Sequence, residues 1–173
     1  EALREAVKYA PDDARLHHEL SQAYAAVQNG PGALAAIARA VELEPNNLTY
    51  LRARGEVATW TGYYAVALDS FERVLAVAPK DADALLGAAR AGARSGKPDA
   101  AVPRYRAYLA QRPDDKDVML EYMEVEAERG NTQAVKEYDA RYRERFGESK
   151  EYWLRMADIY ALGGDATASS AAL

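Results

Sequence analysis

The residues of this sequence with the clearest chemical potential are two adjacent histidines and a cluster of glutamates. His17 and His18 follow each other directly, so on a helix their side chains point about 100° apart and cannot share a metal ion as residues four apart do. The acidic cluster comprises Glu121, Glu124, Glu126 and Glu128. Its segment lacks the glycine-turned loop that calcium prefers. We therefore expect a solvated helix face at the cluster and a helix-packing role for His17.

The sequence carries no recognised catalytic constellation. Neither the histidines nor any serine belongs to a nucleophile motif, and no glycine-rich loop follows a strand. Cysteine is absent, which excludes disulfides and thiolate metal sites. The sequence therefore predicts a protein that is not an enzyme and binds no cofactor or metal. Its function is expected to depend on a surface.

Composition limits the kinds of partner. The chain has 173 residues, a net charge of −5 and a pI near 5.2, which argue against nucleic acid or an anionic membrane as the main partner. No apolar run approaches the roughly 18 residues of a membrane span, so direct membrane insertion is not expected. The chain starts at Glu1 inside a helical pattern, and we expect it to be a fragment of a longer protein.

A fixed period organises the whole chain. Four prolines are spaced 34 residues apart (45 − 11, 79 − 45 and 113 − 79). They are Pro11, Pro45, Pro79 and Pro113. Such a period is typical of repeat arrays, in which each unit needs neighbours to bury its apolar face. We predict one array over 1–173, whose parts are a partial repeat 1–13, full repeats 14–47, 48–81, 82–115 and 116–149, and a truncated repeat 150–173.

Each repeat is expected to be a pair of antiparallel amphipathic helices. Apolar residues recur at three- and four-residue spacing in two blocks, with turn residues between them. The proline stops the second helix, and pairs such as Asp12-Asp13 can cap the next one. The fourth turn, at Gly130-Asn131, looks one residue short. Pro103 falls inside a second helix and predicts a kink or a delayed start there.

These repeats resemble the tetratricopeptide repeat (TPR) family. The residues that carry the resemblance include His17, Leu20, Tyr24, Ala33, Ile37, Ala40 and Pro45, then Leu51, Gly55, Gly62, Ala67, Phe71 and Pro79, then Leu85, Ala88, Gly96, Ala101, Tyr105 and Pro113, and finally Trp153, Tyr160 and Gly164. The resemblance implies an all-α, right-handed superhelical solenoid that binds other proteins. The chaperone-binding clamp of the family is not expected, because Asp83 at one of its positions would repel a carboxylate.

The resemblance also implies a binding groove along the first helices of the repeats. The expected groove residues are Arg15, His18, Gln22, Arg52, Glu56, Thr59, Leu86, Arg90, Leu120, Glu124, Leu154 and Asp158. Basic residues fall in its N-terminal half and acidic ones in its C-terminal half, with the three leucines between them. Such a groove suits an extended or helical protein segment. The alternative to a binding groove is that these charges are ordinary solvated side chains. Trp60, next to the turn of the second full repeat, is either an anchor for a partner or a residue that packs beneath a neighbouring turn.

We therefore expect a protein–protein interaction scaffold. The loops at 112–115 and 163–165 are similar to those of periplasmic TPR regions in bacterial exopolysaccharide export, which recruit a polymer-modifying enzyme. That similarity favours the periplasm, with a partner that is a periplasmic enzyme. A self-assembling oligomer that stacks end to end and a generic cytoplasmic adaptor remain alternatives. RNA recognition by a helical-repeat protein and catalysis are the least favoured functions.

Overall fold

Helices and short turns make up the protein. The computed structural model describes residues 1–172, and over that range it contains helices and no strand. The helices are α1 (Ala2–Tyr9), α2 (Ala14–Ala26), α3 (Gly30–Leu43), α4 (Leu48–Trp60), α5 (Tyr64–Val77), α6 (Ala82–Arg94), α7 (Pro98–Gln111), α8 (Lys116–Glu128), α9 (Thr132–Phe146), α10 (Lys150–Leu162) and α11 (Ala166–Ala172). The expected all-α fold of repeated helix pairs is confirmed.

The starting points of the helices follow the period of the prolines. First helices begin at Ala14, Leu48, Ala82, Lys116 and Lys150. Second helices begin at Gly30, Tyr64, Pro98, Thr132 and Ala166. Both series advance by 34 residues per repeat (48 − 14 and 64 − 30). In each of the five pairs, three residues separate the end of the first helix from the start of the second. The expectation of a shorter fourth turn is wrong: residues 129–131 match residues 61–63 in length.

Capping side chains and prolines set the helix ends. The carboxylate of Asp13 accepts hydrogen bonds from the backbone N–H groups of Arg15 and Leu16, at 3.0 and 3.2 Å. The same role falls to Asn47, Asp81, Asp115 and Ser149 at the later first helices. Each satisfies a backbone donor that lacks a partner within its helix. Helices α1, α3, α5 and α7 each end two residues before one of the periodic prolines.

The chain forms two compact units. Unit 1 spans residues 1–95 and holds α1 to α6, and unit 2 spans residues 96–173 and holds α7 to α11. The boundary falls in the turn of the predicted repeat 82–115. A single continuous array and its right-handed superhelix stay predictions.

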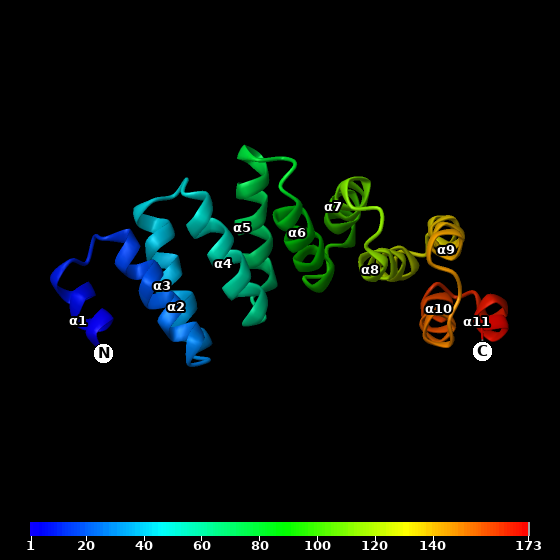
Figure 1. Ribbon diagram of the computed structural model, residues 1–173, viewed down its shortest axis with the longest axis horizontal. Coiled ribbons are helices and arrows are strands. Elements are labelled where there is room, and N and C mark those ends of the chain that lie inside the picture. The colour runs from blue at the N-terminus through cyan, green and yellow to red at the C-terminus, as the bar shows by residue number, and fades with distance from the viewer. Residues whose placement is uncertain (173) are drawn as a thin grey trace. The chain divides into compact units, whose positions relative to one another are not determined.

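In unit 1, small residues allow close helix packing. Helices α2 and α3 lie side by side, as do α4 and α5 (Figure 1). Ala33 and Ala67 are fully buried within these pairs. The ring of Phe71 on α5 enters a space bounded by Gly55 and Gly87, where an added Cβ would lie 2.7 and 2.6 Å from ring atoms. The two glycines therefore make room for the aromatic side chain that joins α4, α5 and α6.

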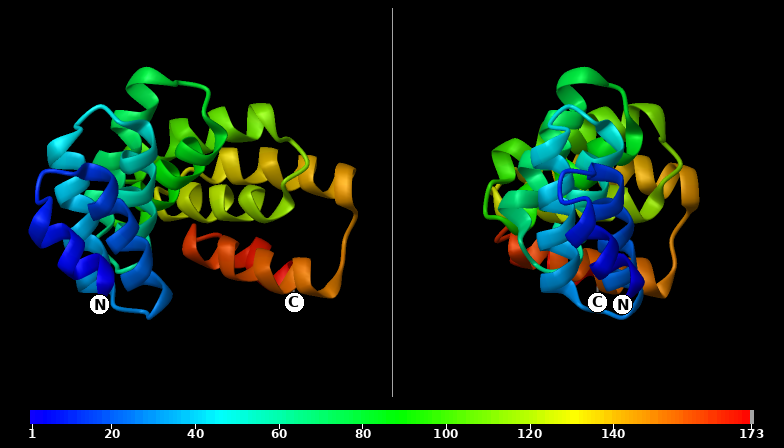
Figure 2. Two further views of the ribbon diagram at one scale, coloured as in Figure 1. Left: turned by 60° about the vertical axis from the view of Figure 1, so that its left-hand side comes forward. Right: turned by 90° about the vertical axis from the view of Figure 1, so that its left-hand side faces the viewer.

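In unit 2, the core forms around α8. Helix α8 packs against α7, α9 and α10, and its course beside α9 can be followed in Figure 2. Tyr122, Met123 and Met156 have no exposed surface. Helix α7 runs through Pro103, which is exposed, and begins at Pro98 in register with the other second helices. The delayed start considered for this helix is therefore wrong, and a kink at Pro103 stays a prediction.

Candidate functional site

Two hollows lie on the first-helix face of unit 1. One, of about 400 Å³, is bounded by α2 and α4 and is lined by His18, Gln22, Arg52 and Glu56 among others. The ring centres of His18 and Tyr50 lie 5.1 Å apart. The side-chain nitrogens Nε2 of Gln22 and Nε2 of His18 lie 3.3 Å apart. This hollow therefore has a polar wall on its α2 side.

The second hollow is more apolar. It has a volume of about 360 Å³ and is bounded by α4, α5 and α6. Trp60, Phe71 and Leu86 line it, together with Arg52 and Glu56. Because Arg52 and Glu56 line both hollows, the two spaces adjoin along α4. They offer a partner a mixed surface, with charges at the centre and an aromatic and aliphatic wall at one end.

Arg52 is held in place by the start of the next repeat. Its guanidinium forms an ion pair with Asp81, and the same carboxylate accepts a hydrogen bond from the backbone N–H of Ala84 at 2.8 Å. Burial alone would raise the pKa of Asp81, but these hydrogen bonds outweigh burial and lower the pKa below its usual value. The carboxylate therefore stays charged and fixes Arg52 between the hollows.

Trp60 packs on one side, and its role as an interface anchor stays a prediction. Its side chain is half exposed and lines the second hollow. One edge of its ring also approaches the preceding repeat, since an added Cβ on Gly30 would lie 3.7 Å from the ring. The indole is thus supported on one side and accessible on the other, which suits an interface anchor.

Seven of the eight groove residues predicted in unit 1 line these hollows. They are His18, Gln22, Arg52, Glu56, Thr59, Leu86 and Arg90. Arg15 does not line either hollow: it is exposed and forms a 2.8 Å ion pair with Glu19 one turn along α2. Whether these residues bind a partner stays a prediction.

The four groove residues predicted in unit 2 lie on α8 and α10, which pack together. Leu120 and Glu124 are one turn apart on α8, and Leu154 and Asp158 are one turn apart on α10. Glu124 pairs at 2.7 Å with Arg155, which the sequence analysis did not include. Burial raises the pKa of the Glu124 carboxyl despite this partner. Leu154 is 49 % exposed.

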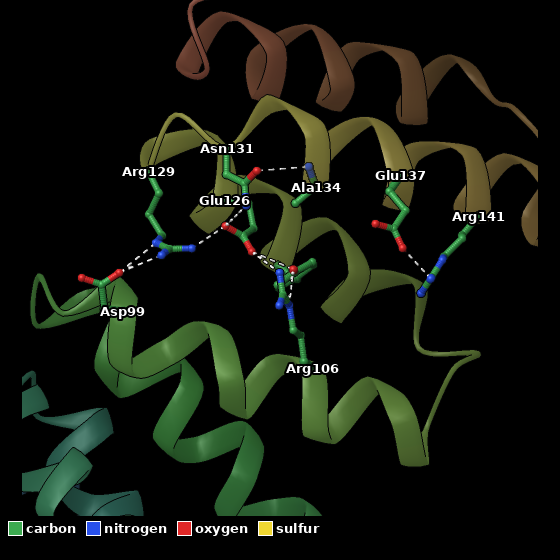
Figure 3. Close-up of polar contacts among 9 residues, drawn as sticks. Asp99, Arg106, Glu126, Arg129, Asn131, Ala134, Glu137 and Arg141 are labelled. Carbon is green, nitrogen blue, oxygen red and sulfur yellow. Dashed lines mark hydrogen bonds and ion pairs between the residues drawn. The ribbon is translucent and has the colours of Figure 1, made fainter.

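Within the acidic cluster on α8, Glu126 does not lie on the solvated face expected from the sequence. Glu126 is fully buried, and its carboxylate accepts four hydrogen bonds (Figure 3). One oxygen accepts from the Tyr122 hydroxyl at 2.7 Å and from Arg106 at 3.0 Å. The other accepts from Arg129 at 2.6 Å and from Asn131 at 3.1 Å. The expectation was wrong because Glu126 points into the α7–α8–α9 contact, where two arginines meet its charge.

A second buried carboxylate, Asp139 on α9, was also missed. It accepts hydrogen bonds from the hydroxyl groups of Tyr152 and of Tyr160, the latter at 2.7 Å. Burial, followed by the hydrogen bond to Asp139, raises the pKa of Tyr160 well above its usual value. Like Glu126, this group joins helices and has no access to a ligand.

The repeat register contained the signal for both carboxylates. Glu126 stands one repeat after Gly92 and two repeats after Ala58, both of which are buried. Asp139 stands one repeat after Tyr105, which is also buried. Burial could thus have been expected at both positions, although their partners could not.

The His17 side chain has the packing role expected for it. It is buried, and its ring Nε2 lies 2.9 Å from the carbonyl oxygen of Pro11. Within residues 1–172, no three His, Asp or Glu side chains gather in an arrangement able to hold a metal ion. None of the helices in that range combines the length and apolar character needed to cross a membrane.

Comparison with known proteins supports the repeat assignment. Residues 61–116 and 89–134 match the model of the family described as "Tetratricopeptide repeat". No curated protein matches the chain.

Several solved structures share the fold. YrrB, described as a TPR protein with an unusual peptide-binding site, has 19% identity and a TM-score of 0.75, over 99% of this chain and 89% of its own. A tetratricopeptide repeat protein from Parabacteroides merdae has 18% identity and a TM-score of 0.75, over 98% and 68%. PilW, a type IV pilus biogenesis factor, has 18% identity and a TM-score of 0.69, over 98% and 79%. Likeness at this identity shows the fold alone. The family model therefore supports tetratricopeptide repeats over residues 61–134, and the solved structures share the fold.

Proposed function

We propose that the protein is a non-catalytic scaffold that holds a segment of a partner protein in the two adjoining hollows of unit 1. The observation that carries this proposal is the continuity of the hollows along α4, where Arg52 and Glu56 line both. TPR proteins generally bind other proteins, and YrrB is described as having a peptide-binding site.

The lining suggests what the partner segment contains. An apolar side chain can pack against Trp60 and Leu86, because the second hollow is walled by aromatic and aliphatic groups. Polar groups of the partner segment on either side of that apolar side chain can contact the guanidinium of Arg52 and the exposed carboxylate of Glu56. A segment with an apolar residue between charges of both signs therefore fits best.

The resemblance to exopolysaccharide export proteins adds a narrower proposal. Under it, the partner is a periplasmic enzyme that modifies a polysaccharide, and the chain is the recruiting region of a longer envelope protein. This context rests on the sequence resemblance alone. A parent gene without a segment encoding an outer-membrane barrel would count against it.

A binding comparison tests the scaffold role. Glu56→Lys reverses the charge shared by both hollows, and we expect recovery of partner proteins from extracts of the source cells to fall at least about fivefold. Replacing Trp153 by phenylalanine leaves Trp60 as the sole tryptophan, so its fluorescence should change when a recovered partner is added.

The matched control is Glu42→Lys, which makes the same charge change on α3, outside both hollows. Glu42 is exposed and pairs only with the neighbouring Arg39 among the residues that the structure describes, so its replacement should leave the fold intact. Equal partner recovery with Glu56→Lys, Glu42→Lys and the unchanged protein would exclude the unit 1 hollows as the binding surface.

A further inference from the structure

A third hollow lies in unit 2, away from the first-helix face. It has a volume of about 550 Å³ and is bounded by α7, α9 and the start of α8. Leu109 and Met119 form its buried floor. None of the predicted groove residues lines it. A space of this size is within the range of ligand-binding pockets.

Arginine side chains gather at this hollow. Arg106, Arg141 and Arg145 line it, against a single acidic residue, Glu144. Each of these arginines also pairs with a carboxylate, so the hollow is rich in arginine side chains without being a region of net positive charge. Figure 3 shows that Arg106 lies on α7 and Arg141 on α9, so the arginines come from different helices.

The three arginine side chains remain accessible although each has a partner. Arg106, Arg141 and Arg145 are 54%, 54% and 46% exposed. Arg106 is fixed by the buried Glu126, and its guanidinium lies 5.7 Å from the centre of the Tyr122 ring. It therefore forms a rigid edge of the hollow.

Arg141 and Arg145 are easier to redirect than Arg106. Arg141 pairs with Glu137 one turn away, and Arg145 pairs with Asp114, whose side chain is 70% exposed. Ion pairs this exposed contribute little to stability, so exchange of their carboxylates for those of a ligand costs little. The Arg141 guanidinium also lies over the Tyr138 ring, at 4.8 Å from its centre, which keeps it near the opening.

We propose that this hollow binds a short acidic segment of a partner protein, with carboxylates on the arginines and one apolar side chain on the Leu109–Met119 floor. Charge complementarity selects the acidic groups, and arginine suits carboxylates because its planar fork donates two hydrogen bonds. The apolar floor selects a protein segment over a simple anion. Nucleic acid and anionic membrane are disfavoured, since they extend past the hollow onto a surface of net negative charge.

Synthetic peptides test this proposal without knowledge of the natural partner. The probe is a fluorescein-labelled hexapeptide of alternating glutamate and leucine, with binding followed by fluorescence anisotropy at low salt. We expect saturable binding that weakens as salt rises. Exchange of glutamate for lysine should abolish binding, and exchange of leucine for serine should weaken it.

Variants locate the binding to the hollow. Arg141→Gln combined with Arg145→Gln should weaken binding by about fivefold or more. Glu144→Gln removes the opposing charge and should tighten binding about twofold. Arg4→Gln with Arg39→Gln is the matched control, because Arg4 also lies over a tyrosine ring and Arg39 also forms exposed ion pairs, both in unit 1. This control should bind as the unchanged protein does.

Four results would overturn the proposal. They are no binding of the acidic peptide, equal binding of the lysine peptide, equal affinity in the Arg141/Arg145 double variant, and tighter binding of a single-stranded oligonucleotide than of the acidic peptide. Circular dichroism of each variant shows whether it is folded. The unit 1 proposal is tested by separate variants, so the two can fail independently.

Discussion

Replacement of Glu126 by glutamine should destabilise unit 2 more than any other single charge removal on α8. The carboxylate is fully buried and each oxygen accepts two hydrogen bonds, from Tyr122 and Arg106 and from Arg129 and Asn131. A glutamine side chain has the same shape. It differs in lacking the negative charge and in carrying an NH₂ group in place of one oxygen.

The loss of free energy of unfolding follows from the groups that the NH₂ group contacts. Whichever way the amide turns, it faces two donors, and one of them belongs to an arginine that cannot accept a hydrogen bond. Hydrogen bonds to charged groups contribute about 1.5–3 kcal/mol each. Arg106 and Arg129 are partly exposed and recover some hydration, so we expect a loss of about 2–3 kcal/mol in the free energy of unfolding.

The loss should depend on pH in a defined direction. Burial alone would raise the pKa of the Glu126 carboxyl, but hydrogen bonds from Tyr122, Asn131 and Arg129 outweigh burial and lower the pKa. Its stabilising effect is therefore complete above the unfolded pKa of about 4.3 and is lost as the pH falls through the lower folded pKa. The difference between the two proteins should be constant from about pH 5 to 8 and shrink below about pH 4.

Unfolding in urea, followed by the fluorescence of Trp153, measures this effect in unit 2. Trp60 is replaced by phenylalanine in both proteins so that its emission does not contribute. Glu124→Gln is the control on the same helix. Because burial raises the pKa of Glu124, loss of its charge should be nearly neutral at pH 7. A Glu126→Gln cost below about 1 kcal/mol, or a difference that does not change with pH, would refute the reasoning.

Two further predictions concern the backbone and packing of unit 1. Gln28 has a φ of 55° and occupies the same turn position as Gly62, whose φ is 82°. Positive φ is strained for a residue with a side chain and not for glycine. Gln28→Gly should therefore raise the free energy of unfolding by about 1 kcal/mol, and Gly62→Gln should lower it by a similar amount. Chemical denaturation checks both, and stabilisation by the second variant would contradict the argument. Gly55→Ala and Gly87→Ala each place a methyl group against the Phe71 ring and should cost about 1–3 kcal/mol, and unchanged melting temperatures would show that the ring can move.

The repeat architecture could be predicted from the sequence because it depends on local chemistry. Pro45 and Pro79 each follow the end of a helix, since proline lacks an N–H group and disfavours helical geometry in the residue before it. Asn47 and Asp81 cap the helices that follow, again through contacts within three residues. A small residue recurs at the same position of three successive repeats, as Ala33, Ala67 and Ala101, and marks the helix crossings. The all-helical fold followed from these features.

The burial of Glu126 and Asp139 was not predicted, because it depends on contacts between helices. In the sequence, Glu126 is one of several glutamates on a polar segment. In the structure, α7 and α9 pack beside it and bury it between Arg106 and Arg129. Asp139 similarly meets Tyr152 and Tyr160 from α10.

The sequence by itself determined the repeat period and most of the helix ends, because caps, prolines and turn glycines act on their immediate neighbours. Only the tertiary structure decided which charges are buried and paired, and that Arg141 and Arg145 line one hollow. A charge costs free energy in the interior unless an opposite charge meets it, and its partners come from helices distant in sequence. Spacing within one helix does not contain that information.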